Sequence, residues 1–375
     1  GVERGGPFSS GAYMKEHAWY YDLVRSWEGT LSYPGSPVGD QEHGKHTTWD
    51  CTGSYLLAYA AAKRSLFLTG KKGGVVLPFS RAETQKVIAA GRHHFVLPED
   101  SHDKFTNTQL LKDLSSWSPV ERKLAADALG RRKDASIVPE LMKMLDSKLP
   151  QARYGACEAL EKIGTPEADV AGDKLRGALK DPDPWVRCLA SQALVELSSE
   201  QRLASVPDIL RLAAENSPND PRGQVQRYAS LALFSGLPGT RPKTKRLLAD
   251  SLDGVDRGLL HQAITTLLKN EDSVTRGAVS LTYGKLKDAD IAVLLPAIIN
   301  AVDQRSPSGE MFGAGIRHAG LDLLTRLHVR DGIPLCIKLI QNKNGDWGVQ
   351  PAIVMDYLLR YGVHAKSVLP ELEDK

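Results

Sequence analysis

Arg187-Cys-Leu-Ala190-Ser-Gln-Ala-Leu194 repeats a phrase already present as Arg153-Tyr-Gly-Ala156-Cys-Glu-Ala-Leu160 and as Arg122-Lys-Leu-Ala125-Ala-Asp-Ala-Leu129. Each copy places a polar residue first, a small residue three positions later and a leucine seven positions later. These three positions share one face of an α-helix. The phrase returns whole at Arg317-His-Ala-Gly320-Leu-Asp-Leu-Leu324, and looser copies begin at 226, 260 and 351. The phrase therefore predicts a series of helices that each bury the same face.

A second helix is predicted after most copies of the phrase. The segments that predict it are 137–145, 171–179, 206–212 and 333–340. Loops such as Lys180-Asp-Pro-Asp-Pro184 separate the units, because prolines cannot continue a helix. The long step between 260 and 317 leaves room for one more helix pair, near 274–303. A helix pair every 30–40 residues buries its apolar face only by stacking, which predicts an all-α protein of the α-solenoid type.

The segment from Asp181 to Leu194, Asp-Pro-Asp-Pro-Trp-Val-Arg-Cys-Leu-Ala-Ser-Gln-Ala-Leu, resembles a HEAT repeat of the short bacterial, PBS-lyase-like kind. The resemblance covers about 117–370. It implies an armadillo-like α-α superhelix that serves as a protein-binding scaffold, although related arrays include bilin lyases and DNA glycosylases. It also implies that each phrase arginine pairs with an aspartate of a neighbouring repeat, for which Asp127, Asp146 and Asp181 are available.

Residues 1–60 differ from the rest, because they hold 10 of the 24 aromatic residues. The cluster around Trp19 and Trp49 resembles the closing helices of a squalene-cyclase-like α/α-toroid, as found in bacterial proteins of unassigned function. No DxDD motif is present, so terpene cyclisation is not implied. We predict two domains: an N-terminal helical segment with its connector over 1–106, and a HEAT-like array over 107–375.

The aromatic block also contains histidines, and together they form a candidate site for a carbohydrate or an apolar small molecule. Its candidate ligand-binding residues are His17, Trp19, Tyr20, His43, His46 and Trp49. Aromatic packing in a helical core explains the same residues. His43 and His46 with Asp50 or Cys51 could ligate zinc, but two adjacent residues point to different faces. A loop that caps the next helix is the preferred interpretation, and no metal or cofactor is predicted.

Composition excludes some functions. The net charge is only +3, whereas nucleic-acid binding usually requires a basic face, so DNA is the weakest partner hypothesis. The sequence has no apolar run of about 18 residues that could span a membrane. The chain begins with Gly1, which leaves cytoplasmic and exported locations open. Cys157 and Cys188 are interpreted as buried thiols of the core. A loop group of His93, His94, His102 and Asp103 is interpreted as solvated side chains.

The sequence shows no nucleophile, base and acid at a recognisable spacing, which favours a non-enzymatic role without excluding an enzyme. The main hypothesis is a scaffold that binds a protein or peptide on the concave face of the array. We expect the second helices of the pairs to build that face. The candidate protein-binding residues on these helices are Glu140, Lys143, Lys174, Asp208 and Arg211.

Overall fold

The computed structural model describes residues 11, 12, 15, 80–82, 84, 85, 102–216, 220, 223–234, 246–248, 251–305, 313–342, 349–368 and 370. The regular elements within these ranges are α-helices and short 3-10 helices, which confirms the predicted all-α class. The chain divides into two compact units, Gly1–Ala128 and Leu129–Lys375, and the division falls within α5 (Pro119–Arg132). The domain boundary expected at 106/107 remains a prediction.

In the first unit, α4 (Asn107–Asp113) begins with a reciprocal cap. The Gln109 backbone N–H donates to the Thr106 hydroxyl at 3.3 Å, and the Thr106 N–H donates to Gln109 Oε1 at 2.8 Å. His102 is only 6% exposed, with its ring centroid 4.7 Å from that of Phe105 and its Nε2 4.0 Å from Asp113 Oδ2. The expectation of a solvated side chain was therefore wrong for His102, because local packing buries it.

The second unit is a series of paired helices. In chain order they are α6 (Val138–Met144), α7 (Pro150–Ile163), α8 (Gly172–Ala178), α9 (Pro184–Val195), α10 (Ser199–Ala214), α11 (Gln224–Leu233), α12 (Arg257–Leu268), α13 (Ser273–Ser280), α14 (Asp288–Asp303), α15 (Gly313–Arg326), α16 (Gly332–Ile340) and α17 (Pro351–Arg360). Helices α7, α9 and α17 start with proline, whose fixed φ suits the first helical position. Pro184, which was expected to separate two helices, therefore begins the second of them.

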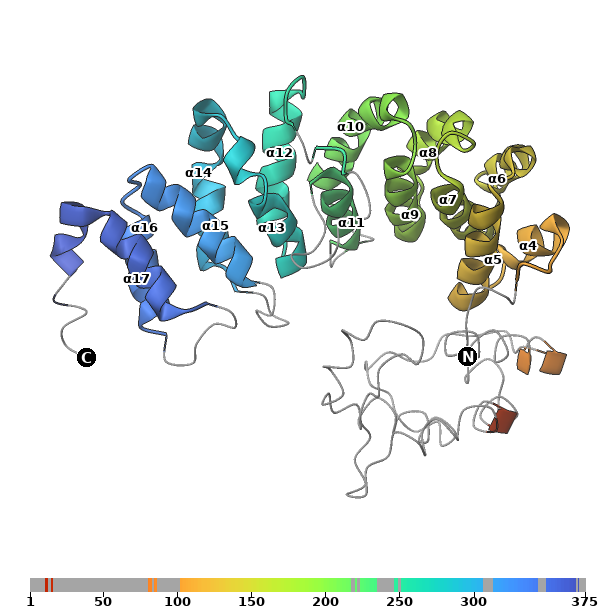
Figure 1. Ribbon diagram of the computed structural model, residues 1–375, viewed down its shortest axis with the longest axis horizontal. Helices are drawn as coiled ribbons and strands as arrows, with labels where there is room; N and C mark the ends of the chain where they lie inside the picture. Colours follow the sequence, from red (N-terminus) through yellow and green to blue (C-terminus); the bar gives the residue numbers. More distant parts are fainter. Residues whose placement is uncertain are drawn as a thin grey trace. The chain divides into compact units, whose positions relative to one another are not determined.

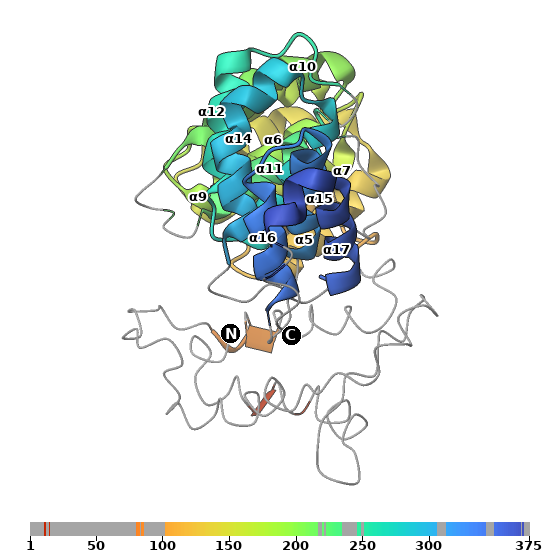
Figure 2. The same cartoon turned by 90° about the vertical axis from the view of Figure 1, so that its left-hand side faces the viewer.

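Two layers of helices run through this unit. The phrase layer consists of α7, α9, α11, α13, α15 and α17, each packed against the next (Figure 1). The second layer consists of α8, α10, α12, α14 and α16, and α6 packs against α7. Figure 2 views the stack from its C-terminal end, with α16 and α17 in front of the earlier helices. In the described part of this unit, the main contacts between residues distant in sequence therefore lie between consecutive repeats, as in a solenoid.

The small and leucine positions of the phrase lie in the core of the stack. Ala156, Ala190 and Ala229 are fully buried, and so are the leucines four residues after each of them. A small side chain lets helices approach closely, and the leucine fills the space beside it. The packing role predicted for this face is confirmed.

One assignment along the phrase was wrong. The copy expected at 260 lies on α12, which packs between α10 and α14 in the second layer. The next helix of the phrase layer is α13, whose leading arginine is Arg276. An apolar face at the same spacing occurs in both layers, so periodicity alone could not tell them apart. The helix pair predicted near 274–303 is confirmed as α13 and α14.

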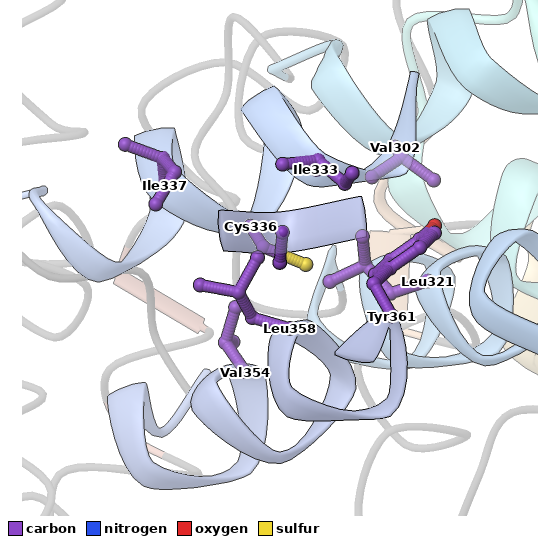
Figure 3. Close-up of a cluster of buried hydrophobic side chains, with 9 residues drawn as sticks. Val302, Leu321, Ile333, Cys336, Ile337, Val354, Leu358 and Tyr361 are labelled. Atoms are coloured by element: carbon purple, nitrogen blue, oxygen red, sulfur yellow. The ribbon is translucent and has the colours of Figure 1, made fainter. Parts of the chain in front are cut away.

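The cysteines that the structure describes are free thiols in the core. Cys157, Cys188 and Cys336 are at most 1% exposed, which confirms the interpretation of the first two. Burial raises the pKa of Cys188 to about 12, so the reactive thiolate is scarce at neutral pH. Figure 3 shows Cys336 of α16 beside Val354 and Leu358 of α17, where it acts as a small apolar side chain.

Candidate functional site

We call the contact between two consecutive repeats, formed by the start of a phrase-layer helix and the loops beside it, a joint. The phrase arginines lie at these joints. Arg153 Nη2 donates to Asp181 Oδ1 at 2.9 Å, and Arg153 Nε lies 2.8 Å from Oδ2 of the same carboxylate. Its Nη1 donates to the Ser147 carbonyl at 2.8 Å. Both charged side chains are 11% exposed. This bidentate ion pair with an aspartate in the loop of the following repeat is the arrangement that the HEAT resemblance implied.

The other joints vary this arrangement. Arg187 pairs with Glu215 at 2.8 Å rather than with an aspartate. Asp146, expected to receive a phrase arginine, forms an ion pair with Lys174. Arg276 was missed in the sequence because the phrase was assigned to residue 260 on α12 instead of to α13. Its Nη1 donates to the carbonyls of Asn270 at 2.7 Å and Glu271 at 3.2 Å.

The joint at the start of α11 carries no arginine at its leading position. Gln226 holds that position on α11, and its Nε2 donates to the Glu215 carbonyl at 2.8 Å and to Asn216 Oδ1 at 3.0 Å. Its Oε1 accepts from Asn270 Nδ2 at 2.7 Å. Gln226 and Asn270 are each 7% exposed. A neutral pair of amides therefore replaces the ion pair found at the joint of Arg153.

A cleft of about 380 Å³ opens at this joint, and we call it the amide cleft. Polar and charged side chains from α9, α11, α12 and the loops beside them dominate its wall. Its lining residues are Arg187, Glu215, Asn216, Asp220, Gly223, Val225, Gln226, Thr266, Lys269, Asn270 and Glu271. The hydrogen bonds of Gln226 and Asn270 hold its floor in one arrangement, so a ligand would meet a pre-organised surface.

Gly223 sets the shape of the amide cleft. It precedes α11 with φ +62°, in the left-handed region that favours glycine. A Cβ at this position would lie 2.3 Å from Asn270 Nδ2, so the asparagine could not keep its place. Asp220 supports the same turn, because its carboxylate accepts from the backbone N–H groups of Gln224 at 2.9 Å and Val225 at 2.7 Å.

A second cleft of about 350 Å³ lies in the second layer, and we call it the layer cleft. Its lining residues are Leu179, Lys180, Asp208, Arg211, Leu212, Ala214, Glu215 and Gln262. Two candidate protein-binding residues, Asp208 and Arg211, are among them, and Arg211 Nη1 donates to Asp208 Oδ1 at 2.7 Å. Glu215 lines both clefts, so the layer cleft and the amide cleft adjoin at the end of α10.

The other candidate protein-binding residues lie outside the two clefts. Lys143 and Glu140 form an exposed ion pair at 3.0 Å one turn apart on α6. Lys174 of α8 makes the ion pair with Asp146 already described. The five predicted residues are thus spread over three helices, and the structure brings only Asp208 and Arg211 into a common cleft.

The candidate ligand-binding residues of the aromatic block, His17, Trp19, Tyr20, His43, His46 and Trp49, lie outside the described residues, as do Asp50 and Cys51. The carbohydrate or small-molecule site therefore stays a prediction. Among the described residues, no three histidine, cysteine, aspartate or glutamate side chains gather where they could hold a metal ion. No helix in the described part is long and apolar enough to cross a membrane.

Comparison with known protein families agrees with this geometry. Residues 107–171 and 173–201 match HEAT repeats, and residues 1–70 match a domain of unknown function, DUF6288. The chain is therefore a HEAT-repeat helical protein over the matched part of the array. No curated protein matches the chain. HEAT repeats commonly mediate contacts between proteins, which agrees with a scaffold role.

Proposed function

We propose that this protein is an interaction scaffold that binds a segment of a polypeptide partner in the layer cleft. The observation that carries the proposal is the pairing of an apolar floor with a charged rim. Leu179, Leu212 and Ala214 form the floor, and Lys180 and Arg211 stand at the rim. Protein interfaces have the same anatomy, with a desolvated apolar centre inside a polar border.

The surface beside the layer cleft extends this site along α10. Leu203, Pro207 and Arg211 follow one another at four-residue spacing, so they share one helical face. Leu203 is 69% exposed, and Pro207 and Arg211 are exposed as well. An apolar side chain held in water next to a cleft stabilises a complex when a partner covers it.

Charge also favours a polypeptide as the occupant. Asp208 and Arg211 neutralise each other, whereas Lys180 makes no ion pair with a described residue. A partner segment that carries an apolar residue beside an acidic one would fill the floor and pair with Lys180. Small-molecule sites are mostly enclosed and apolar, and the charged rim of this cleft differs from them.

A peptide-display selection against the whole chain tests the proposal. Enriched peptides are measured against a variant in which Asp208→Lys and Arg211→Asp exchange the charges of the ion pair. The matched control exchanges Glu140→Lys and Lys143→Glu, a pair with the same spacing on α6. We expect the first exchange to weaken binding at least about tenfold, since it adds an acidic side chain at the α10 rim, and the control to leave it within about twofold.

Two outcomes would contradict the proposal. One is a selection in which no peptide is enriched over many rounds. The other is a set of peptides that bind both charge-exchanged variants as well as the original chain. Circular dichroism of both variants checks that the exchange of charges leaves the helices intact.

A further inference from the structure

The amide cleft lies where other repeats place an arginine. At four described joints, Arg122, Arg153, Arg276 and Arg317 donate to backbone carbonyls of the loop before their own helix. Arg153 and Arg187 also pair with a carboxylate of the following loop. The joint of Gln226 keeps this frame of carbonyls and side chains, but its leading residue is shorter and carries no charge.

The shorter side chain leaves room that an arginine would occupy. The Gln226 amide satisfies the nearest carbonyl and the Asn270 amide, and the amide cleft opens beside them. Both partners at this joint are neutral, whereas Arg153 and Asp181 are charged. The change therefore removes the cation at the leading position without leaving a buried polar group unpaired, which would be costly. The neighbouring Arg227 keeps its ion pair with Asp272 at 3.6 Å.

The described wall of the amide cleft has more unused acceptors than donors. It holds three carboxylates, of Glu215, Asp220 and Glu271, against the cations of Arg187 and Lys269. The Arg187 side chain is 7% exposed and already paired with Glu215. An ionised carboxylate offers about four lone-pair sites, so Glu215 and Asp220 keep free capacity. The exposed Glu271 side chain makes no ion pair with a described residue.

We propose that the amide cleft binds an arginine side chain of the polypeptide partner, in place of the arginine that other repeats carry. This inference rests on the proposed scaffold function and names one residue of the bound segment. A guanidinium is planar and carries five N–H donors, so it can bond several carboxylate and carbonyl oxygens at once. A lysine ammonium is a compact charge and matches this spread of acceptors less well.

Because the layer cleft adjoins the amide cleft, one bound peptide segment can occupy both. Glu215 lines both clefts, and an extended chain advances about 3.3 Å per residue. A segment whose apolar residue occupies the layer cleft can therefore place a nearby arginine in the amide cleft. The Glu215 carboxylate would lie between the two side chains.

The test uses acetyl-arginine amide as a probe, with the neutral isostere acetyl-citrulline amide as its control. Binding to the whole chain is followed by the change in melting temperature at increasing probe concentration. We expect the arginine probe to stabilise the protein in the millimolar range, with an affinity at least about fivefold greater than that of the citrulline probe. Added salt should reduce the difference, because it screens charges that face solvent.

Two variants locate the binding site. Gln226→Arg fills the cleft from within and should abolish the response to the arginine probe. Glu271→Gln removes an unpaired carboxylate at the rim of the amide cleft and should weaken the response to the arginine probe several-fold. If the Gln226→Arg variant does not fold, Glu271→Gln alone tests the location of the site. Asp288→Asn, at an exposed site on α14 that lines neither cleft, should leave the response unchanged.

Equal stabilisation by the two probes would overturn the assignment, as would a full response in the Gln226→Arg variant or no response to the arginine probe. These results are separable from those for the layer cleft, since the probe is a single residue. Arginine binding without peptide binding would contradict the scaffold function alone. Peptide binding that is lost on charge exchange, without arginine binding, would contradict the amide-cleft assignment alone.

Discussion

Two joints of the array, those of Arg153 and Gln226, connect consecutive repeats through different kinds of side-chain pair. Asp181 and Asn270 each lie three residues before a phrase-layer helix, α9 or α13. The first receives the guanidinium of Arg153, and the second donates to the amide oxygen of Gln226. The leading residue and its partner change together, from an ion pair to a pair of amides. In these two joints the leading residue matches its partner in charge and in hydrogen bonding, and a cleft opens beside the neutral pair.

The largest effect is expected when only one partner of the charged joint is changed. Arg153→Gln leaves Asp181, which is 11% exposed, without its cation. Breaking a largely buried ion pair in this way should lower the free energy of unfolding by about 3 kcal/mol. The measurement is a urea unfolding curve of the whole chain, followed by circular dichroism.

A second change should then recover most of the loss. Adding Asp181→Asn copies the amide pair of Gln226 and Asn270, and the double variant should unfold within about 1 kcal/mol of the original protein. A double variant as unstable as Arg153→Gln alone would show that the two joints are not interchangeable.

The next largest effect concerns the turn that shapes the amide cleft. Gly223→Ala should destabilise the protein by about 2 kcal/mol, because alanine is strained at φ +62° and its Cβ displaces the Asn270 amide. Gly177→Ala on α8 is the control, since no atom lies within 4 Å of its added Cβ. That change should be neutral or stabilising by up to about 1 kcal/mol, because alanine favours a helix. Similar losses in both variants would contradict the role of Gly223.

A smaller effect is expected at the leucine position of the repeat that follows. Tyr283 lies seven residues after Arg276, is 4% exposed, and its hydroxyl makes no hydrogen bond. Tyr283→Phe removes a buried polar atom and should stabilise the protein by about 1 kcal/mol. Tyr361→Phe should do the opposite, because the Tyr361 hydroxyl donates to the Val329 carbonyl at 2.9 Å. Equal changes in melting temperature would refute the distinction.

The smallest expected effect on stability depends on pH. It concerns Glu196 and Glu161, which lie at the C-terminal ends of α9 and α7. Burial, and then the charge of Glu161, raise the pKa of Glu196 above its ordinary value. The folded protein therefore holds this proton to a higher pH than the unfolded chain does, and stability falls as pH rises between the two pKa values.

Glu196→Gln removes this penalty. The variant should melt at a higher temperature than the original protein at pH 7, and the difference should shrink as the pH falls below the ordinary pKa of a glutamate. Melting curves between pH 4 and pH 7 provide the measurement. A difference that stays constant over this range would show that burial of the charge is not its cause.

Much of the stack could be predicted because its signal is local and repeated. The spacing of Ala190 and Leu194 from Arg187 already specifies which face of a helix is buried, and each copy confirms the others. The pairing of Arg153 with Asp181 followed from the HEAT resemblance. The pairing of Arg187 with Glu215 instead of an aspartate could not be predicted, since the length of the loops decides which carboxylate reaches the guanidinium.

The candidate site was predicted only in part. Asp208 and Arg211 could be named as exposed charges on a second helix, but Glu140, Lys143 and Lys174 share those features and line neither cleft. Gln226 was noticed only as a position where the arginine is lost. Its pairing with Asn270, 44 residues later, joins helix α11 to the loop before α13, and their approach depends on how neighbouring repeats pack.

Periodicity in the sequence was sufficient for the helices, their buried faces and their stacking, because each of these depends on residues within one repeat or the next. The layer to which α12 belongs, the amide pair of Gln226 and Asn270, and the two clefts that share Glu215 were decided by the tertiary structure. An apolar stripe does not say which neighbour will cover it. A cleft is the space left when side chains from several elements fail to fill a joint, and only their arrangement in three dimensions reveals it.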